Sequence, residues 1–162
     1  MKHFILSLFT LCMITHYALP SVAKDQINKI HALNASEIIE KTHSLKNPVK
    51  VIFFYASWCG YCRKAMPIIA EAEIEKAGSI IAVSVDDNQL KALKYLNRQE
   101  LMPFEGITLD GDKNSIEKEL GIENRKGLPF YVIIGPDNEV KFSGNVSAES
   151  IKKLVLRDFN KP

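Results

Sequence analysis

The chain has 162 residues, of which 46% are hydrophobic and 25% are charged, and its formal net charge is +2. This length and composition are typical of one globular domain that is large enough to bury a hydrophobic core. The small net charge excludes a strongly basic or acidic chain, so no nucleic-acid partner is expected. The sequence holds no internal repeat, low-complexity tract or linker.

The first residues have the pattern of a secretory signal peptide. Met1–His3 is a short positive region, and Phe4–Ile14 is apolar except for two hydroxyl residues. Small residues stand where signal peptidase reads the chain, so we expect a signal peptide over residues 1–23, cleaved after Ala23. One domain over residues 24–162 would remain. The alternative is an uncleaved membrane anchor, but the apolar run is short for a bilayer.

Two apolar runs predict strands that are buried on both faces. These runs, Val49–Ala56 and Ser79–Val85, are rich in β-branched and other large apolar residues. Each is followed by a segment of helical composition, Gly60–Ala77 and Gln89–Arg98. Two βα units are therefore expected in succession. Pro67 lies inside the first helix and should kink it.

Short signals mark the boundaries of the neighbouring elements. An edge strand is expected around Ile27 and Ile30. Asn34 and Glu37 have the spacing of a capping box at the start of a helix. Asp86–Asn88 is interpreted as the cap of the helix that follows the second strand. The apolar face of that helix is expected to comprise Leu90, Leu93 and Leu96.

The last third of the chain predicts a hairpin followed by a helix. Before it, Pro103–Asp112 is expected to be a loop or short strand, and Asn114–Leu120 a short helix. Phe130–Ile134 and Glu139–Gly144 are expected to pair across a tight turn at Gly135–Asn138. The closing helix, which starts near Ser147, is expected to turn inward Ile151, Leu154, Val155 and Phe159. The whole order indicates an α/β domain whose early strands are parallel.

The cysteines form a pair at the junction of a predicted strand and a predicted helix. Cys12 would leave with the signal peptide, so the mature chain would hold only Cys59 and Cys62. Exported proteins with structural disulfides usually have several cysteines at long spacing. The start of a helix presents free N–H groups and a partial positive charge, which stabilise a thiolate. The pair therefore predicts thiol–disulfide exchange.

Over residues 48–159 the chain resembles the thioredoxin superfamily and, within it, the exported TlpA/DsbE-like thiol–disulfide oxidoreductases. The resemblance rests first on the active-site run Phe54–Cys62 and on Pro67, five residues beyond the second cysteine. It rests also on Gly127–Pro129, which looks like the family's cis-proline loop, and on the closing hairpin Phe130–Phe142.

This resemblance implies a thioredoxin-like α/β fold. A central mixed sheet would have flanking helices, and a β-hairpin and a helix would end the chain. A further segment would be inserted between the second central strand and the cis-proline, Pro129. The stretch Asp87–Leu120 has the place of that segment.

Three single residues and the pair between the cysteines depart from the family pattern. Phe53 stands where thioredoxin has a buried aspartate, and Ala65 stands where many TlpA-like reductases have a glutamate. No proton acceptor for Cys62 can therefore be named from the sequence. Phe130 replaces the family's usual threonine after the cis-proline. The pair between the cysteines, Gly60–Tyr61, is neither that of thioredoxin nor that of the oxidant DsbA, so the direction of electron transfer stays open.

Cys59 is expected to be the attacking thiolate and Cys62 the buried resolving thiol. One alternative is a permanent small-loop disulfide. Another is half of a zinc site, but His31 and His43 lie before the first central strand without metal-like spacing, so no metal site is expected.

The residues around the pair are expected to bind substrate. Trp58 and Tyr61, with Gly60, would form a rim around the first cysteine, although Trp58 could serve packing alone. The resemblance implies a cis peptide bond before Pro129, which would let Leu128 offer its backbone to an extended substrate. The alternative for Pro129 is a residue that only starts a strand.

The leading hypothesis is an exported thiol–disulfide oxidoreductase of the bacterial periplasm that acts on protein substrates as a reductant. It needs no cofactor beyond the Cys59–Cys62 disulfide, and a reductant would need an electron-donating membrane partner. The first alternative is an oxidase or isomerase that installs disulfides. An alternative of another class is a Cu(I) metallochaperone, since soft thiolates suit that ion. The oligomeric state does not follow from the sequence.

Overall fold

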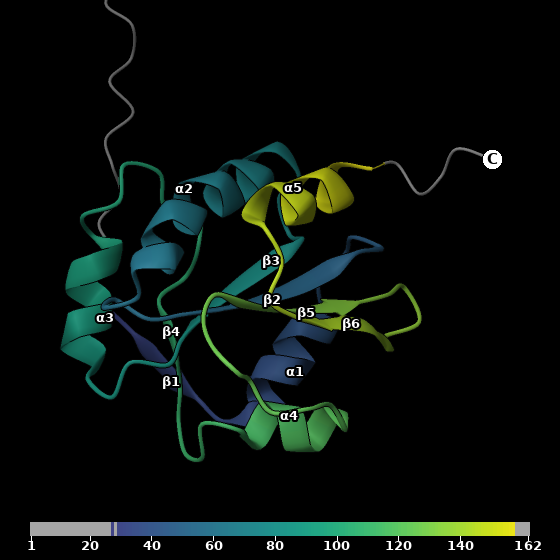
Figure 1. Ribbon diagram of the computed structural model, residues 1–162, viewed down its shortest axis with the longest axis horizontal. Helices are drawn as coiled ribbons and strands as arrows, with labels where there is room; N and C mark the ends of the chain where they lie inside the picture. Colours follow the sequence, from purple (N-terminus) through teal and green to yellow (C-terminus); the bar gives the residue numbers. More distant parts are fainter. Residues whose placement is uncertain (1–26, 28, 158–162) are drawn as a thin grey trace, which may run out of the picture.

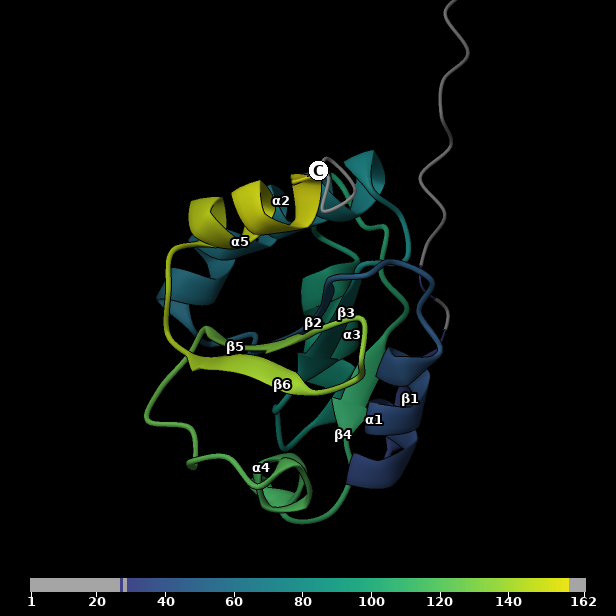
Figure 2. The same cartoon turned by 90° about the vertical axis from the view of Figure 1, so that its right-hand side faces the viewer.

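A computed structural model describes residue 27 and residues 29–157. One six-stranded mixed sheet runs through the molecule, with helices on both faces (Figures 1 and 2). The spatial order of its strands is β1-β4-β3-β2-β5-β6. The strands are β1 (His31–Leu33), β2 (Lys50–Tyr55), β3 (Ile80–Ser84), β4 (Ile107–Leu109), β5 (Phe130–Ile134) and β6 (Val140–Gly144). The helices are α1 (Ala35–His43), α2 (Gly60–Glu75), α3 (Gln89–Leu96), α4 (Ser115–Leu120) and α5 (Ala148–Leu156).

Strand β2 is the centre of the sheet because its residues are apolar on both sides. All six of its residues are buried. Val51, Phe53 and Tyr55 face a core shared with α2, α3 and α5, whereas Ile52 and Phe54 face a second core shared with α1 and α4. Alternate residues of a strand point to opposite faces, so a continuous apolar run gives a strand covered on both sides. Figure 2 shows the two helical layers above and below the sheet.

The pairing of strands confirms the mixed sheet predicted from the sequence. Strand β3 lies parallel to β2, and β4 lies parallel to β3. Strand β5 is antiparallel to β2 and forms the expected hairpin with β6. The inserted segment supplies α3, β4 and α4, and β4 carries β1 at the edge of the sheet. The thioredoxin-like fold is thus present with its insertion.

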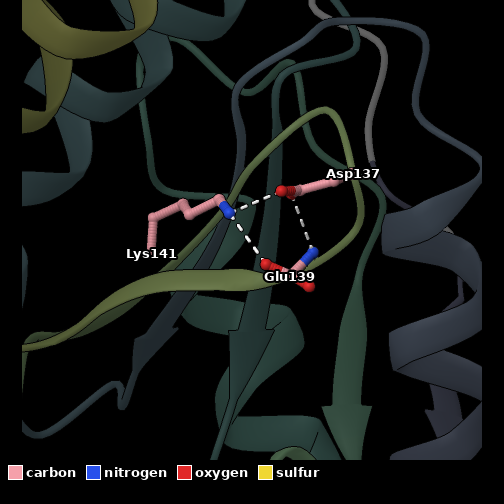
Figure 3. Close-up of polar contacts among 3 residues, drawn as sticks. All are labelled: Asp137, Glu139 and Lys141. Carbon is pink, nitrogen blue, oxygen red and sulfur yellow. Dashed lines mark hydrogen bonds and ion pairs between the residues drawn. The ribbon is translucent and has the colours of Figure 1, made fainter.

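The hairpin turn is held by its own charges. Gly135 accepts a hydrogen bond from the Asn138 N–H at 3.0 Å, and Asn138 has a positive φ of 63°. The Lys141 ammonium lies 2.5 Å from Asp137 and 3.0 Å from Glu139, as Figure 3 shows. The positive charge of Lys141 is therefore paired with two acids of the turn.

Several local predictions are confirmed and others are wrong. The capping box of Asn34 and Glu37 is formed, and Pro67 lies inside α2. The first strand lies at His31–Leu33 rather than around Ile27 and Ile30, because pairing with β4 sets its position. The predicted positions of Phe159 and the signal peptide lie outside the described residues.

Helix α3 differs from its prediction in cap and in face. Asn88 alone is its N-cap; its side chain accepts from the N–H groups of Leu90 and Lys91. Of the predicted face, Leu96 is buried and Leu93 packs partly buried against the core, but Leu90 is 55% exposed. The helix also buries Ala92 and Tyr95. The register of the helix against the sheet decides this face, which the spacing of leucines alone does not fix.

No helix in the described part of the chain is long and apolar enough to cross a membrane.

Candidate active site

The two cysteines lie where the central strand passes into the helix that covers it. Strand β2 ends at Tyr55, and α2 begins at Gly60, with Cys59 as its N-cap residue. Cys59 has the extended backbone of an N-cap, with φ −78° and ψ 111°. Its sulfur accepts a hydrogen bond from the N–H of Cys62 at 3.0 Å. The sulfur thus occupies the place that a capping oxygen usually takes, at the positive end of the helix.

The pair is joined as a disulfide, and its two members differ in exposure. Their Cα atoms are 5.2 Å apart. Cys62, one turn into the helix, is completely buried, whereas Cys59 is 6% exposed. An incoming group can therefore reach Cys59 before it can reach Cys62. Such an arrangement gives one sulfur access to a partner and keeps the other within the protein.

The loop before β5 lies directly against Cys59. The Leu128 carbonyl oxygen is 3.6 Å from the Cys59 sulfur, and the Leu128–Pro129 peptide bond is cis. The side-chain amide of Asn145 donates to the Pro129 carbonyl at 2.5 Å. Two segments that are 69 residues apart in the sequence are thus joined at the redox pair.

A buried ion pair anchors the start of this loop. The Arg125 guanidinium lies 2.6 Å from the Glu117 carboxylate on α4, and both side chains are nearly inaccessible. The same guanidinium lies 4.4 Å from the centroid of the Phe54 ring. Burial lowers the pKa of Arg125, and the neighbouring Glu117 opposes this change. The loop that carries Leu128 is therefore fixed to the helix and to the central strand.

Two aromatic side chains next to the cysteine pair are exposed to solvent. Trp58 is 67% exposed and Tyr61 is 75% exposed, so neither is a core residue. Tyr61, Leu128 and Pro129 border a groove of about 390 Å³ whose other wall comes from α2 and the start of α5. Exposed aromatic side chains beside a groove are typical of surfaces that bind a polypeptide.

Asp86 has a role that sequence reasoning missed. It was interpreted as part of a helix cap, but its carboxylate accepts from the N–H of Ser57 at 2.8 Å and from the Ser57 hydroxyl at 2.7 Å. The Ser84 hydroxyl donates to it at 2.8 Å. Asp86 thus fixes the loop two residues before Cys59. Asp86 and Ser57 come together only because β3 pairs with β2. No local sequence pattern therefore predicts their hydrogen bonds.

An aromatic layer occupies the place where thioredoxin has its buried acid. Phe53 is fully buried and stacks on Tyr55 and Tyr131, with ring centroids 5.7 and 5.3 Å away. Burial raises the pKa of Tyr55 and of Tyr131, so both phenols stay neutral at physiological pH. Ala65 is buried in the same core. This layer is therefore aromatic and uncharged, and its only polar atoms are the two phenol hydroxyls.

The described residues contain no group of three or more His, Cys, Asp or Glu side chains placed to hold a metal ion. Met66 is fully buried and packs in the core with α2 and the sheet.

Known proteins share this fold and sequence pattern. A sequence model of the Redoxin family matches residues 24–155. The thioredoxin of Staphylococcus aureus is 28% identical over 86 residues, which are 52% of this chain and 79% of that protein.

Among solved structures, a thioredoxin-related protein from Neisseria meningitidis is 28% identical with a TM-score of 0.53. That match covers 69% of this chain and 85% of the other. A thiol:disulfide interchange protein from Chlorobium tepidum has a TM-score of 0.56 at 18% identity, over 70% of this chain and 81% of the other. The second likeness shows the fold alone. The chain belongs to the Redoxin family, and it is a thioredoxin-like thiol–disulfide oxidoreductase with the CxxC pair Cys59–Cys62.

Proposed function

We propose that this protein is an exported oxidoreductase that exchanges the Cys59–Cys62 disulfide with protein substrates and acts as a reductant. One observation carries the proposal: the disulfide lies at the start of α2, with Cys59 slightly exposed (6%) and Cys62 completely buried. The helix end and the N–H of Cys62 stabilise negative charge on the Cys59 sulfur. Cys59 is the nucleophile, and Cys62 is the resolving thiol.

The exchange has two steps. The Cys59 thiolate attacks one sulfur of a substrate disulfide, forms a mixed disulfide and releases the other substrate sulfur as a thiolate. The Cys62 thiolate then attacks the Cys59 sulfur, which closes the Cys59–Cys62 disulfide and releases the second substrate sulfur. Two electrons pass from the protein to the substrate, and the thiolates released take up protons from water.

The substrate chain binds across the exposed rim. Trp58 and Tyr61 contact it on either side of the nucleophile, and Gly60 keeps the space between them open. Leu128 and Pro129 hold an extended strand of substrate, since the Leu128 carbonyl already lies 3.6 Å from the Cys59 sulfur. The groove of about 390 Å³ beside Tyr61 takes an apolar side chain of the substrate.

Action as a reductant requires a donor of two electrons, and we propose a membrane electron-transfer protein in this role. The positive first residues, the apolar run Phe4–Ile14 and the small residues before Lys24 support export. Export is tested by N-terminal sequencing of the protein from the periplasmic fraction, where a mature chain that begins at Lys24 is expected.

The direction of transfer is tested by the reduction potential of the pair, measured against glutathione and dithiothreitol buffers. We expect a value near that of thioredoxin, about −270 mV. A value near about −120 mV, as in DsbA, would instead make the protein a disulfide donor and would contradict the assignment as a reductant. Either value is compatible with Cys59 as the nucleophile.

A further inference from the structure

A second groove borders the loop that carries Ser57 and leads to Cys59, and Leu128 does not line it. Its volume is about 430 Å³, and it is lined by Ser57, Arg63, Lys91, Lys94, Tyr95, Arg98 and Gln99. Ser57 is two residues before Cys59. The Arg63 guanidinium lies 3.9 Å from the position that a Cβ on Gly60 would take. The groove therefore begins at the active-site loop and extends over α3.

The groove is lined by four exposed cations and by no acid. Lys91 and Lys94 lie one turn apart on α3, Arg98 follows just beyond the helix, and Arg63 faces them from α2. None of the four has an ion-pair partner in the described part of the chain. Many other cations of the described surface are neutralised. The paired ones include Lys41, Lys113, Lys118, Lys126, Lys141 (Figure 3) and Lys152.

The floor of the groove offers a further polar group. Tyr95 lines the groove and is 8% exposed, and its hydroxyl has no hydrogen-bond partner within the residues that the structure describes. Asp86 and Asp87 act electrostatically on Tyr95 and Lys91, but each has other partners. Asp86 accepts from Ser57 and Ser84, and Asp87 pairs with Lys113. The positive charge here is therefore local, although the whole chain is close to neutral.

We propose that an acidic segment of the protein partner occupies this groove while the partner's sulfur reacts at Cys59. The inference rests on the proposed function and adds the class of substrate. A polypeptide held at the redox pair continues past Ser57 onto α3, where carboxylates of that segment meet the cations. Complementary charge of this kind accelerates encounter and selects partners, and it weakens as salt screens it.

The test uses two peptide disulfides of the same sequence, one flanked by glutamates and the other by lysines. At low salt the wild-type protein is expected to react with the acidic peptide about tenfold faster in kcat/KM, since several exposed ion pairs act together. The variant Lys91→Glu/Lys94→Glu/Arg98→Glu is expected to abolish or reverse this preference. The preference of one protein for two peptides is independent of how much active protein each sample contains.

A matched control reverses three cations far from the redox loop. Lys46, Lys153 and Arg157 are exposed and have no ion-pair partner among the described residues. The variant Lys46→Glu/Lys153→Glu/Arg157→Glu has the same net charge as the groove variant and is expected to keep the wild-type preference. Loss of the preference in both variants would show an effect of net charge alone and would overturn the inference.

Binding measured without turnover separates this inference from the proposed function. Cysteine-free acidic and basic peptides are titrated with the oxidised protein by fluorescence anisotropy. Preferential binding of the acidic peptide supports the inferred binding of acidic segments, even if no disulfide is exchanged. Equal binding of the two peptides overturns that inference, even if exchange is fast. Sodium chloride and citrate at equal ionic strength should displace the acidic peptide equally. Selective displacement by citrate would indicate a small-anion site and would also overturn the inference.

Discussion

The two ends of helix α2 differ in what satisfies their backbone groups. At the start, the sulfur of Cys59 accepts the N–H of Cys62, and the first turn contains no acidic side chain. Near the other end, the carboxylate of Glu73 binds the segment that follows the helix. It accepts from the N–H groups of Gly78, Ser79 and Ile80 at 2.6, 3.0 and 2.8 Å.

The difference shows that the start of α2 is suited to the exchange reaction, whereas its end stabilises the fold. A sulfur at a helix start can lose its bond to another sulfur and still accept the same N–H group. A carboxylate that accepts three N–H groups holds the turn into β3 in one conformation. The side-chain amide of Asn47 also stabilises this end, since it donates a hydrogen bond to the Ala77 carbonyl at 2.8 Å. We therefore expect substitutions at the first end to change activity, and those at the second to change stability.

The largest expected effect is the loss of exchange in Cys59→Ser. A hydroxyl is not a nucleophile toward disulfides at neutral pH, so reduction of insulin should fall to the uncatalysed rate. Stability under reducing conditions should change little. Cys62→Ser is the matched comparison: it keeps the nucleophile and should accumulate the mixed disulfide, visible by mass spectrometry. If Cys59→Ser accumulated the mixed disulfide and Cys62→Ser did not, the two roles would be exchanged.

The next effect concerns the far end of the helix. Glu73→Gln places an amide NH₂ against backbone N–H groups and should lower the free energy of unfolding by about 1–3 kcal/mol. The measurement is urea denaturation of the reduced and oxidised protein. Glu71→Gln is the control, since Glu71 is half-exposed and pairs with Lys152 at the surface. It should cost roughly 0.5 kcal/mol or less. A large loss of insulin reduction in folded Glu73→Gln protein would contradict the division between the two ends.

The smallest effect concerns Tyr95 of α3, whose ring centroid lies 5.7 Å from that of Tyr55. Burial raises the pKa of Tyr95 to about 12. The folded protein therefore keeps this proton when the unfolded chain loses it near pH 10, and stability falls as the pH rises from 10 towards 12. Tyr95→Phe should reduce that alkaline loss. At pH 7 it should change stability by less than about 1 kcal/mol, because the hydroxyl it removes has no described partner.

Thermal unfolding of both proteins between pH 7 and 11 measures this difference. Part of the alkaline loss should remain in Tyr95→Phe, since burial raises the pKa of Tyr55 and Tyr131 in the same direction. Parallel curves for the wild type and the variant would contradict the assignment of the titration to Tyr95.

The local features of this protein can be predicted from neighbouring residues in the sequence. Continuous apolar runs predicted β2 and β3, because a strand covered on both faces has no polar side to present. Asn34 and Glu37 predicted the start of α1 through a capping box that needs only neighbouring residues. The position of Cys59 at the start of α2 followed in the same way from the junction of strand and helix.

The contacts between distant segments could not be predicted in this way and follow from how the elements pack. The Leu128 carbonyl meets Cys59 because β5 pairs with β2, and Asp86 reaches Ser57 because β3 lies beside β2. The cations of α3 form one groove with Arg63 only after the helix packs beside α2. Such contacts depend on the pairing and orientation of whole elements. Local sequence patterns therefore predict the helix caps and the strands. The packing of these elements forms the surface that contacts a partner.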